Sequence, residues 1–229
     1  MPRTRQAGRL DDIVDAALRQ LLTTGYRRTR MSDVAEAAGV SSGLIYTYAA
    51  SKEALFALVL QREVGVDIDG LALPVPTPEP AETAALLRRA LKDVGVISAL
   101  EAAVAVEHPA DPAGELASIV GEHYDAVHRR RTLIKLVERC AADWPDLAAR
   151  FYDKGRRPFV RRLGAYIEER AASGVFRDVP DADVAARFVV ETVAWFANHR
   201  YGDHDGAQIE DDLARATVVQ LVTDALVAP

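Results

Sequence analysis

The stretch Thr29–Leu55, TRMSDVAEAAGVSSGLIYTYAASKEAL, decides the fold that the sequence predicts. Its first part, residues 31–38, carries apolar residues at helical spacing over about two turns. Gly39 is expected to end this helix, because a residue without Cβ readily adopts the left-handed conformation of a tight exit. Ser41 or Ser42 can cap a second short helix, since a hydroxyl accepts from backbone N–H groups at a helix start. A helix, a glycine-containing turn and a second helix form the helix-turn-helix pattern.

The second helix of this pattern is expected to divide its side chains between core and solvent. Leu44 and Ile45 are predicted to face the core, and Tyr46, Thr47 and Tyr48 to form one exposed surface. Arginines precede the helix and a lysine follows it, and phosphate contacts come from Arg, Lys, Ser, Thr and Tyr. The pattern therefore indicates a helix that lies in the major groove of DNA. The alternative is an ordinary pair of core helices.

From Gly25 to Leu55 the sequence resembles the DNA-binding segment of the TetR family of bacterial transcription regulators. The matching residues are Gly25, Tyr26, Thr29, Val34, Ala35, Ala38, Gly39, Val40, Ser41, Gly43, Ile45, Tyr46, Tyr48, Lys52 and Leu55. The resemblance is specific over about residues 10–60 and architectural beyond them. Ser42 stands where a basic residue is common, which would remove one phosphate contact, and Ala49 stands where Phe is common.

The residue types and the resemblance together predict a DNA-binding site. Tyr46, Thr47 and Tyr48 are expected to contact phosphates or base edges, and Thr29, Ser41 and Lys52 to hold the DNA backbone. The full predicted set is Thr29, Arg30, Ser41, Ser42, Gly43, Tyr46, Thr47, Tyr48 and Lys52.

Charge is divided unevenly along the chain. The net charge is −6, yet residues 1–60 hold eight Lys or Arg and six Asp or Glu, a net of +2, so the remainder carries −8. This asymmetry suggests a nucleic-acid module on an acidic body. The residues from Pro2 to Arg9 are predicted to form a basic arm. Its Arg3 and Arg5 could contact a phosphate or the minor groove, unless the arm is simply a mobile terminus.

Other features of the sequence indicate a cytoplasmic protein. No apolar run approaches the roughly 20 residues that a membrane helix needs. The basic N-terminus has no apolar segment after it, so a signal peptide is not expected. The chain has one cysteine, Cys140, which excludes an intrachain disulfide and fits a reducing compartment.

The predicted fold class is all-α. A helix-turn-helix DNA-binding domain of three helices is expected in residues 1–55, with a linking helix at about 51–68, and a helical ligand-binding and dimerisation domain in residues 69–229. The prolines of Leu71–Pro80 predict an extended connector. The other predicted helices span about residues 10–24, 81–94, 98–107, 112–142, 145–173 with a break at Pro158, 181–201 and 208–227.

The last two predicted helices carry apolar stripes with many small and β-branched residues. In the TetR family such helices pair with their mates as a four-helix bundle, so the resemblance predicts a homodimer. The alternative is that both stripes face their own core. The predicted interface contains Phe188, Thr192, Trp195, Val218, Leu221, Val222 and Ala225.

Aromatic residues on the central helices are candidates for binding a small-molecule effector, since pockets between helices are usual ligand sites. That such a pocket exists is implied by the resemblance, and for each aromatic the alternative is core packing. The candidates are Tyr124, Trp144, Phe151, Tyr152 and Tyr166.

Enzymatic and metal-binding patterns are not found in the sequence. It has no GxSxG, HExxH or P-loop motif. His123 and His128 are five residues apart, as are His199 and His204, whereas helical metal pairs need three or four. We therefore predict no enzyme, no cofactor and no metal, and interpret Cys140 as a small buried hydrophobe.

The sequence thus predicts a ligand-responsive transcription regulator. By resemblance it is a homodimeric repressor that a small molecule releases from a palindromic operator in double-stranded DNA. One alternative is a ligand-independent DNA-binding protein with a structural or partner-recruiting role. An enzyme with an accessory DNA-binding domain is a further alternative, which the lack of paired catalytic groups disfavours.

Overall fold

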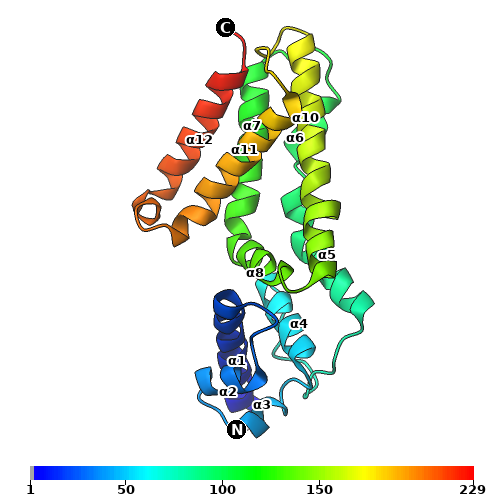
Figure 1. The fold of residues 1–229 in the computed structure, drawn as a ribbon, viewed down its shortest axis with the longest axis vertical. Helices are drawn as coiled ribbons and strands as arrows, with labels where there is room; N and C mark the ends of the chain where they lie inside the picture. The colour runs from blue at the N-terminus through cyan, green and yellow to red at the C-terminus, as the bar shows by residue number, and fades with distance from the viewer. Residues whose placement is uncertain (1–2) are drawn as a thin grey trace. The chain divides into compact units, whose positions relative to one another are not determined.

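The computed structural model describes the backbone of residues 3–229 and the side chains of residues 8–91 and 96–229. Within these residues the regular elements are all helices (Figure 1), and β-structure is limited to two isolated bridges. The predicted all-α class is therefore confirmed. No helix in this part of the chain is long and apolar enough to cross a membrane.

The chain forms two compact units. One contains the residues up to Leu91 together with Thr132–Phe151, and the other contains Lys92–Arg131 together with Tyr152–Pro229. These units differ from the predicted division near residues 55–69, because a segment far along the sequence packs with the N-terminal helices.

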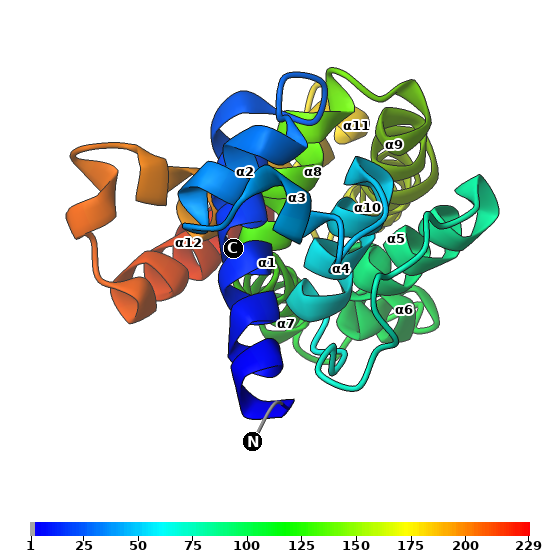
Figure 2. The same ribbon diagram turned by 90° about the horizontal axis from the view of Figure 1, so that it is seen from below.

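The first unit is built around the long helix α1 and the shorter helices α2, α3 and α4 that follow it. Helix α1 packs against α2 and α4, and α2 packs against α3 (Figure 2). Gly25 follows α1 with φ of +83° and Gly39 follows α2 with φ of +65°, which confirms both predicted helix ends. The helices of this unit are α1 (Arg3–Thr24), α2 (Met31–Ala37), α3 (Ser42–Ile45), α4 (Lys52–Glu63), most of α5 (Pro80–Gly95) and of α8 (Arg131–Ala141), and α9 (Pro145–Ala148).

Helix α1 begins earlier than the sequence suggested. It starts at Arg3, whereas a basic arm as far as Arg9 was expected. Arg, Gln and Ala are good helix formers, so this segment can extend the helix. The expected DNA contacts of Arg3 and Arg5 lie outside the described side chains.

The middle of helix α4 is apolar on all sides. Every residue from Ala54 to Leu60 is buried. The Ser51 hydroxyl caps the helix as predicted, accepting from the Ala54 N–H at 3.1 Å. The helix ends at Glu63, before the expected end near Ile68, because Gly65 follows with φ of +74°.

The proline-containing connector is extended, as predicted, and it pairs with the chain that follows α3. The Val75 N–H donates to the Tyr48 carbonyl at 2.8 Å, and the Ala50 N–H donates to the Val75 carbonyl at 2.9 Å. The connector therefore holds the loop between α3 and α4.

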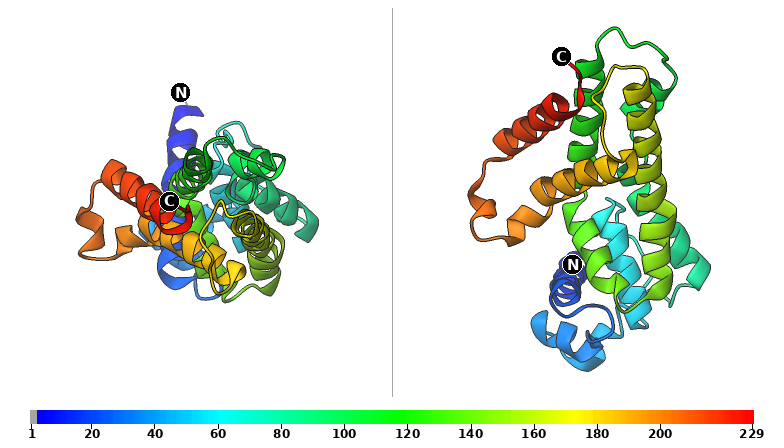
Figure 3. Two further views of the ribbon diagram at one scale, coloured as in Figure 1. Left: turned by 90° about the horizontal axis from the view of Figure 1, so that it is seen from above. Right: turned by 45° about the horizontal axis from the view of Figure 1, so that its top comes forward.

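The second unit is organised around α7. This helix packs against α6, α11 and α12, and α10 packs against α11. Helices α11 and α12 form a hairpin, orange and red in Figure 3. The helices of this unit are α6 (Ser98–Val104), α7 (Pro112–Arg129), α10 (Arg157–Ala172), α11 (Ala182–Ala197) and α12 (Asp211–Leu226).

Two predicted long helices are interrupted in the structure. The expected helix 112–142 is divided into α7 and α8 at Arg130, which has φ of −104° and ψ of 14°. The expected helix 145–173 contains a π-helical segment, Ala149–Arg156, before α10 begins. Pro158 lies in the first turn of α10, so the predicted break there is confirmed.

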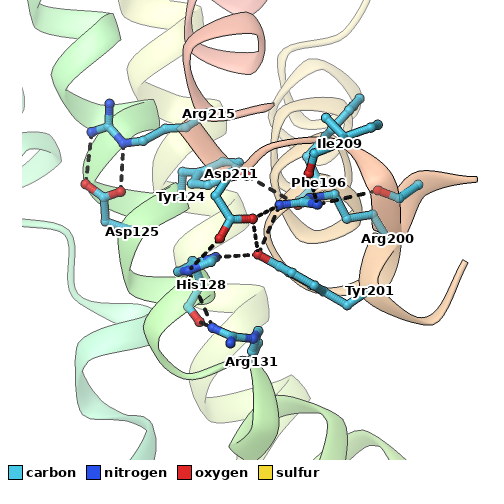
Figure 4. A network of polar contacts seen from close by, with 11 residues as sticks. Tyr124, Asp125, His128, Arg131, Phe196, Arg200, Tyr201, Ile209, Asp211 and Arg215 are labelled. Atoms are coloured by element: carbon cyan, nitrogen blue, oxygen red, sulfur yellow. Dashed lines mark hydrogen bonds and ion pairs between the residues drawn. The ribbon is translucent and has the colours of Figure 1, made fainter. Parts of the chain in front are cut away.

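The loop between α11 and α12 is held by a buried arginine (Figure 4). The Arg200 guanidinium donates to the carbonyls of Phe196 at 2.7 Å and Ile209 at 2.6 Å, and it pairs with the Asp211 carboxylate. The Tyr201 hydroxyl donates to the same carboxylate at 2.6 Å. These contacts fix where α12 starts.

Candidate nucleic-acid interface

The turn between α2 and α3 is closed by its own backbone and by one side chain. The Val40 N–H donates to the Ala35 carbonyl at 2.9 Å across Gly39. The Ser41 hydroxyl then accepts from the Leu44 N–H at 3.2 Å, which decides between the two predicted caps. Ile45 is fully buried and anchors α3. The local sequence thus sets the direction in which the other face of α3 points.

That other face is polar and exposed. Ser41, Ser42, Gly43 and Thr47 are exposed, and the Tyr46 side chain is 50% exposed. All five belong to the predicted DNA-binding set. Such hydroxyl, amide and phenol groups can contact phosphates or base edges.

Leu44 lies on the exposed face, contrary to its predicted place in the core. Its relative exposure is 38%. An apolar side chain there can contact the thymine methyl group in a major groove.

Tyr48 is a correction to the predicted site, because only 7% of it is exposed. It follows Ile45 by three residues, a spacing that returns a side chain to the same side of a helical segment. Its carbonyl also accepts from the connector at Val75. The structure therefore places Tyr48 in the core.

Thr29 is a second correction. It is buried, and its hydroxyl donates to the Gly25 carbonyl at 2.7 Å and lies 2.8 Å from the Thr24 hydroxyl. A buried hydroxyl engaged in this way stabilises the turn between α1 and α2.

Lys52 contributes to the same turn from the start of α4. Its ammonium group donates to the carbonyls of Tyr26 at 2.9 Å and Thr29 at 3.3 Å, and lies 4.4 Å from the centre of the Tyr26 ring. The side chain is half-buried. An ammonium group has three N–H donors, so a third remains for a phosphate.

Exposed arginines surround the turn between α1 and α2. Arg27, Arg28 and Arg30 are all exposed, and Arg30 belongs to the predicted set. The Arg28 Nε donates to the Thr24 carbonyl at 3.0 Å, and the residue is exposed. These charges supply the positive field that attracts a DNA backbone.

An aromatic cluster packs at the turn between α1 and α2, and the sequence did not predict it. The Tyr26 ring lies 4.8 Å from the Trp144 ring and 5.5 Å from Phe56. The Asp143 carboxylate accepts from the Arg27 N–H at 3.2 Å. Trp144, a predicted effector contact, thus packs in the unit that carries the helix-turn-helix. Only contacts between residues distant in sequence create this cluster.

The remaining effector candidates are spread over the fold. Tyr124 is buried and donates to the Phe196 carbonyl at 3.3 Å, and Tyr166 is buried and donates to Glu115 at 2.8 Å. Phe151 is buried in the first unit, whereas Tyr152 is half-buried in the second. An effector pocket made of these aromatics stays a prediction.

The predicted dimer residues fall into two groups. Phe188, Trp195, Leu221 and Ala225 are exposed and Thr192 is half-buried. Val218 and Val222 are corrections, because both are buried within their own unit, where α12 packs against α7. The same two helices also expose apolar residues outside the predicted set, namely Val184 on α11 and Leu213 on α12.

Cys140 is buried. Burial raises the pKa of its thiol to about 12. The thiol is therefore protonated at neutral pH and unreactive, which agrees with its interpretation as a small hydrophobe. Among the described residues, no three His, Cys, Asp or Glu side chains gather where they could hold a metal ion.

The fold and the exposed face of α3 define a helix-turn-helix protein. The model of bacterial regulatory proteins of the tetR family matches residues 13–59, and the model of the AefR-like transcriptional repressor C-terminal domain matches residues 119–226. The chain belongs to the TetR family of bacterial transcription regulators. Proteins of this family are DNA-binding transcription factors and not enzymes. No curated protein sequence matches the chain.

Solved structures of the same fold cover nearly the whole chain. The TetR family regulator PfmR from Thermus thermophilus has 20% identity and a TM-score of 0.54, over 95% of this chain and 96% of that one. The ketosteroid regulator KstR2 of Mycobacterium tuberculosis has 16% identity and a TM-score of 0.55, over 96% of both chains. AibR in complex with isovaleryl coenzyme A and operator DNA has 19% identity and a TM-score of 0.54, over 93% and 97%. At these identities the similarity concerns the fold.

Proposed function

We propose that this TetR-family regulator is a cytoplasmic, homodimeric repressor that binds a palindromic operator and is released from it by a small molecule. The observation that carries the proposal is the exposed face of α3. Ser42 on α3 and the flanking residues Ser41, Tyr46 and Thr47 are exposed, and the opposite side of the helix is anchored by Ile45. A recognition helix held in this way can present its polar groups to the edges of bases.

Exposed apolar side chains on the last two helices support a dimer. Phe188 is 63% exposed on α11, and Leu221 is 62% exposed on α12. An apolar groove of about 430 Å³ lies between residues of α11 and α12, lined by Val184, Phe188 and Ala225 among others. Large exposed apolar patches mark interaction surfaces. A second copy of the chain would cover these residues and carry a second recognition helix.

Release by a ligand requires a difference in affinity between two states. The effector must bind the state that does not bind DNA more tightly than the state that does, since otherwise it shifts nothing. The structure of AibR with isovaleryl coenzyme A and operator DNA supports the idea that this fold can hold both kinds of partner.

Selection of bound sequences from random duplex DNA tests the proposal. We expect a palindrome with half-sites about 34–36 Å apart or a multiple of a helical turn. Operator affinity should fall steeply as salt rises, because phosphate contacts release counterions. A protein that selects no palindrome and shows no salt dependence would contradict the proposal.

A second measurement separates the proposed function from ligand-independent DNA binding. Metabolites and drugs would be screened by thermal shift, and those that stabilise the protein would be added to the operator complex. A compound that stabilises the free protein and lowers operator affinity supports a ligand-released repressor. Operator binding with no hit in a broad library would favour the ligand-independent alternative.

A further inference from the structure

His123 is a buried polar residue in an apolar part of the second unit. Only 5% of it is exposed, and neither ring nitrogen has a hydrogen-bond partner among the described residues. The residues one turn before and after it on α7 are apolar and buried, namely Ile119, Val120, Ala126 and Val127. Its ring lies 4.6 Å from that of Phe159 on α10. Buried polar groups nearly always have partners, so an unpaired one needs an explanation.

The imidazole is neutral in this environment. Burial, and then the positive charge of Arg156, lower the pKa of His123 to about 4. A neutral imidazole carries one N–H donor and one bare nitrogen. The position therefore offers a directed hydrogen bond inside an apolar surrounding, which is the usual composition of a small-molecule site.

Arg156, the cation that acts on His123, shares its acidic partner with a second arginine. The Arg156 guanidinium, at the end of the π-helical segment, lies 2.7 Å from the Glu191 carboxylate on α11. The same carboxylate also pairs with Arg187. Two cations thus share one anion, and the group keeps one positive charge. Arg156 is the more enclosed of the two cations, because 20% of its side chain is exposed, against 54% for Arg187. An anion placed near Arg156 would be stabilised by its charge.

We propose that His123 is the hydrogen-bond donor to the carboxylate of an apolar organic acid, and that such an acid is the small-molecule effector. Arg156 supplies the positive charge that selects the carboxylate over a neutral group. The apolar body of the acid would lie among the side chains that surround the imidazole. This inference rests on the proposed ligand response. It adds the chemical class of the ligand, and it adds His123 and Arg156, which were not among the predicted effector contacts.

Binding of matched ligands to the free protein tests the inference. The probes are straight-chain fatty acids from butyrate to decanoate, each compared with its methyl ester, in thermal shift and calorimetry. We expect acids of suitable length to raise the melting temperature and the corresponding esters to have little effect. If no acid binds, or if each ester binds as well as its acid, the inference is wrong.

Substitutions of His123 separate a ligand contact from a structural role. His123→Phe removes a polar group that has no partner, so the fold should stay as stable or become more stable. Affinity for the acid should fall about ten- to hundred-fold, since hydrogen bonds to charged groups have this magnitude. His123→Gln keeps a donor and should retain part of the affinity. Unfolding of His123→Phe, or acid binding unchanged by it, would overturn the assignment.

Arg156 has a matched control in the next residue. Arg156→Gln should weaken acid binding and leave the esters unaffected, while Arg157→Gln, an exposed residue that pairs with Asp153, should change neither. Equal effects of the two variants would contradict a specific role of Arg156. No DNA is present in these measurements, so failure of operator selection would leave their outcome unchanged. Acid binding that does not release the operator would instead refute the proposed release.

Discussion

Two threonines of the helix-turn-helix differ in what their hydroxyls reach. The Thr29 hydroxyl is buried and donates to the Gly25 carbonyl at 2.7 Å. The Thr47 hydroxyl donates to the Leu44 carbonyl at 2.7 Å, but its side chain is exposed in the turn that follows α3. The same residue type therefore has a stabilising role at one position and a candidate recognition role at the other.

Valine at each position removes the hydroxyl and keeps the shape. Thr29→Val should lower the free energy of unfolding by about 1 kcal/mol, the usual contribution of one hydrogen bond. The salt dependence of operator binding should not change. Thr47→Val should leave stability within about 0.5 kcal/mol, as exposed substitutions do, and alter the ranking among operator variants. Urea unfolding and operator titrations check both. If Thr29→Val is as stable as the native protein and the salt dependence of its operator affinity changes, Thr29 contacts the DNA after all.

The sequence predicts the anchors of the helix-turn-helix better than its exposed residues. Gly39, Ser41 and Ile45 act as expected, because a positive φ, a cap and an apolar contact each follow from one residue type. Tyr48 and Leu44 were assigned to the wrong side. Helix α3 has only four residues, too few for hydrophobic spacing to define a face, and the residues after it follow a turn.

At the scale of elements, the hairpin of α11 and α12 depends on a polar network with α7. The Tyr201 hydroxyl contacts His128 Nδ1 at 3.1 Å as well as the Asp211 carboxylate (Figure 4). Arg131 lies beside the same histidine and donates to its carbonyl at 3.2 Å. The network thus joins the end of α7 to the beginning of α12.

Asp211 makes this network sensitive to acid. The hydrogen bond from Tyr201, followed by that from Arg200, lowers the pKa of Asp211. A carboxyl whose pKa is lowered on folding adds stability above its unfolded value of about 3.9, and this stability is lost as the pH falls through the folded value. Asp211→Asn should therefore cost about 1 kcal/mol at pH 7, a modest value because the side chain is largely exposed to screening water.

Urea unfolding over a range of pH measures this effect. The difference between the native protein and Asp211→Asn should be constant near neutrality and shrink below about pH 4. Asp205→Asn, in the exposed loop between the same helices, is the control and should behave like the native protein. A difference that persists unchanged in acid would mean that the charge of Asp211 does not stabilise the hairpin.

The helix ends that a glycine or a proline marks could be predicted from the sequence. The end of α7, which has no such residue, could not. Gly174 and Pro158 mark an end and a break that the structure confirms. The division between α7 and α8 falls at Arg130, within a run of three arginines that has no helix-breaking residue. Tertiary contacts of His128 and Arg131 accompany that break, and such contacts cannot be read from local sequence.

At the scale of the whole molecule, the composition of the first unit depends on long-range contacts. Arg139 donates to the Thr23 carbonyl at 2.8 Å, and Trp144 packs against Tyr26, across more than 100 residues of sequence. Periodicity within each helix gives no information about such pairs. The helical class and the position of the DNA-binding segment were therefore predictable, whereas the composition of the units was not.

The exposed face of the hairpin decides how two copies of the chain would associate. Leu221 is 62% exposed on α12, whereas Val218, one turn earlier, is 2% exposed and buried within its own unit. A carboxylate at the exposed position meets water in a monomer and meets an apolar partner surface in a dimer. At the buried position it is unpaired in the core of its own unit, which costs several kcal/mol.

Glutamate at these two positions distinguishes the dimer surface from the core. Leu221→Glu should stay helical by circular dichroism and sediment as a monomer at micromolar concentration. Its operator affinity should fall, because two half-sites held by one dimer gain from effective concentration and a single subunit does not. Val218→Glu should instead lose helicity. A folded, dimeric Leu221→Glu protein would show that the partner does not cover this residue, and the interface would then have to lie elsewhere than on the exposed stripe of α12.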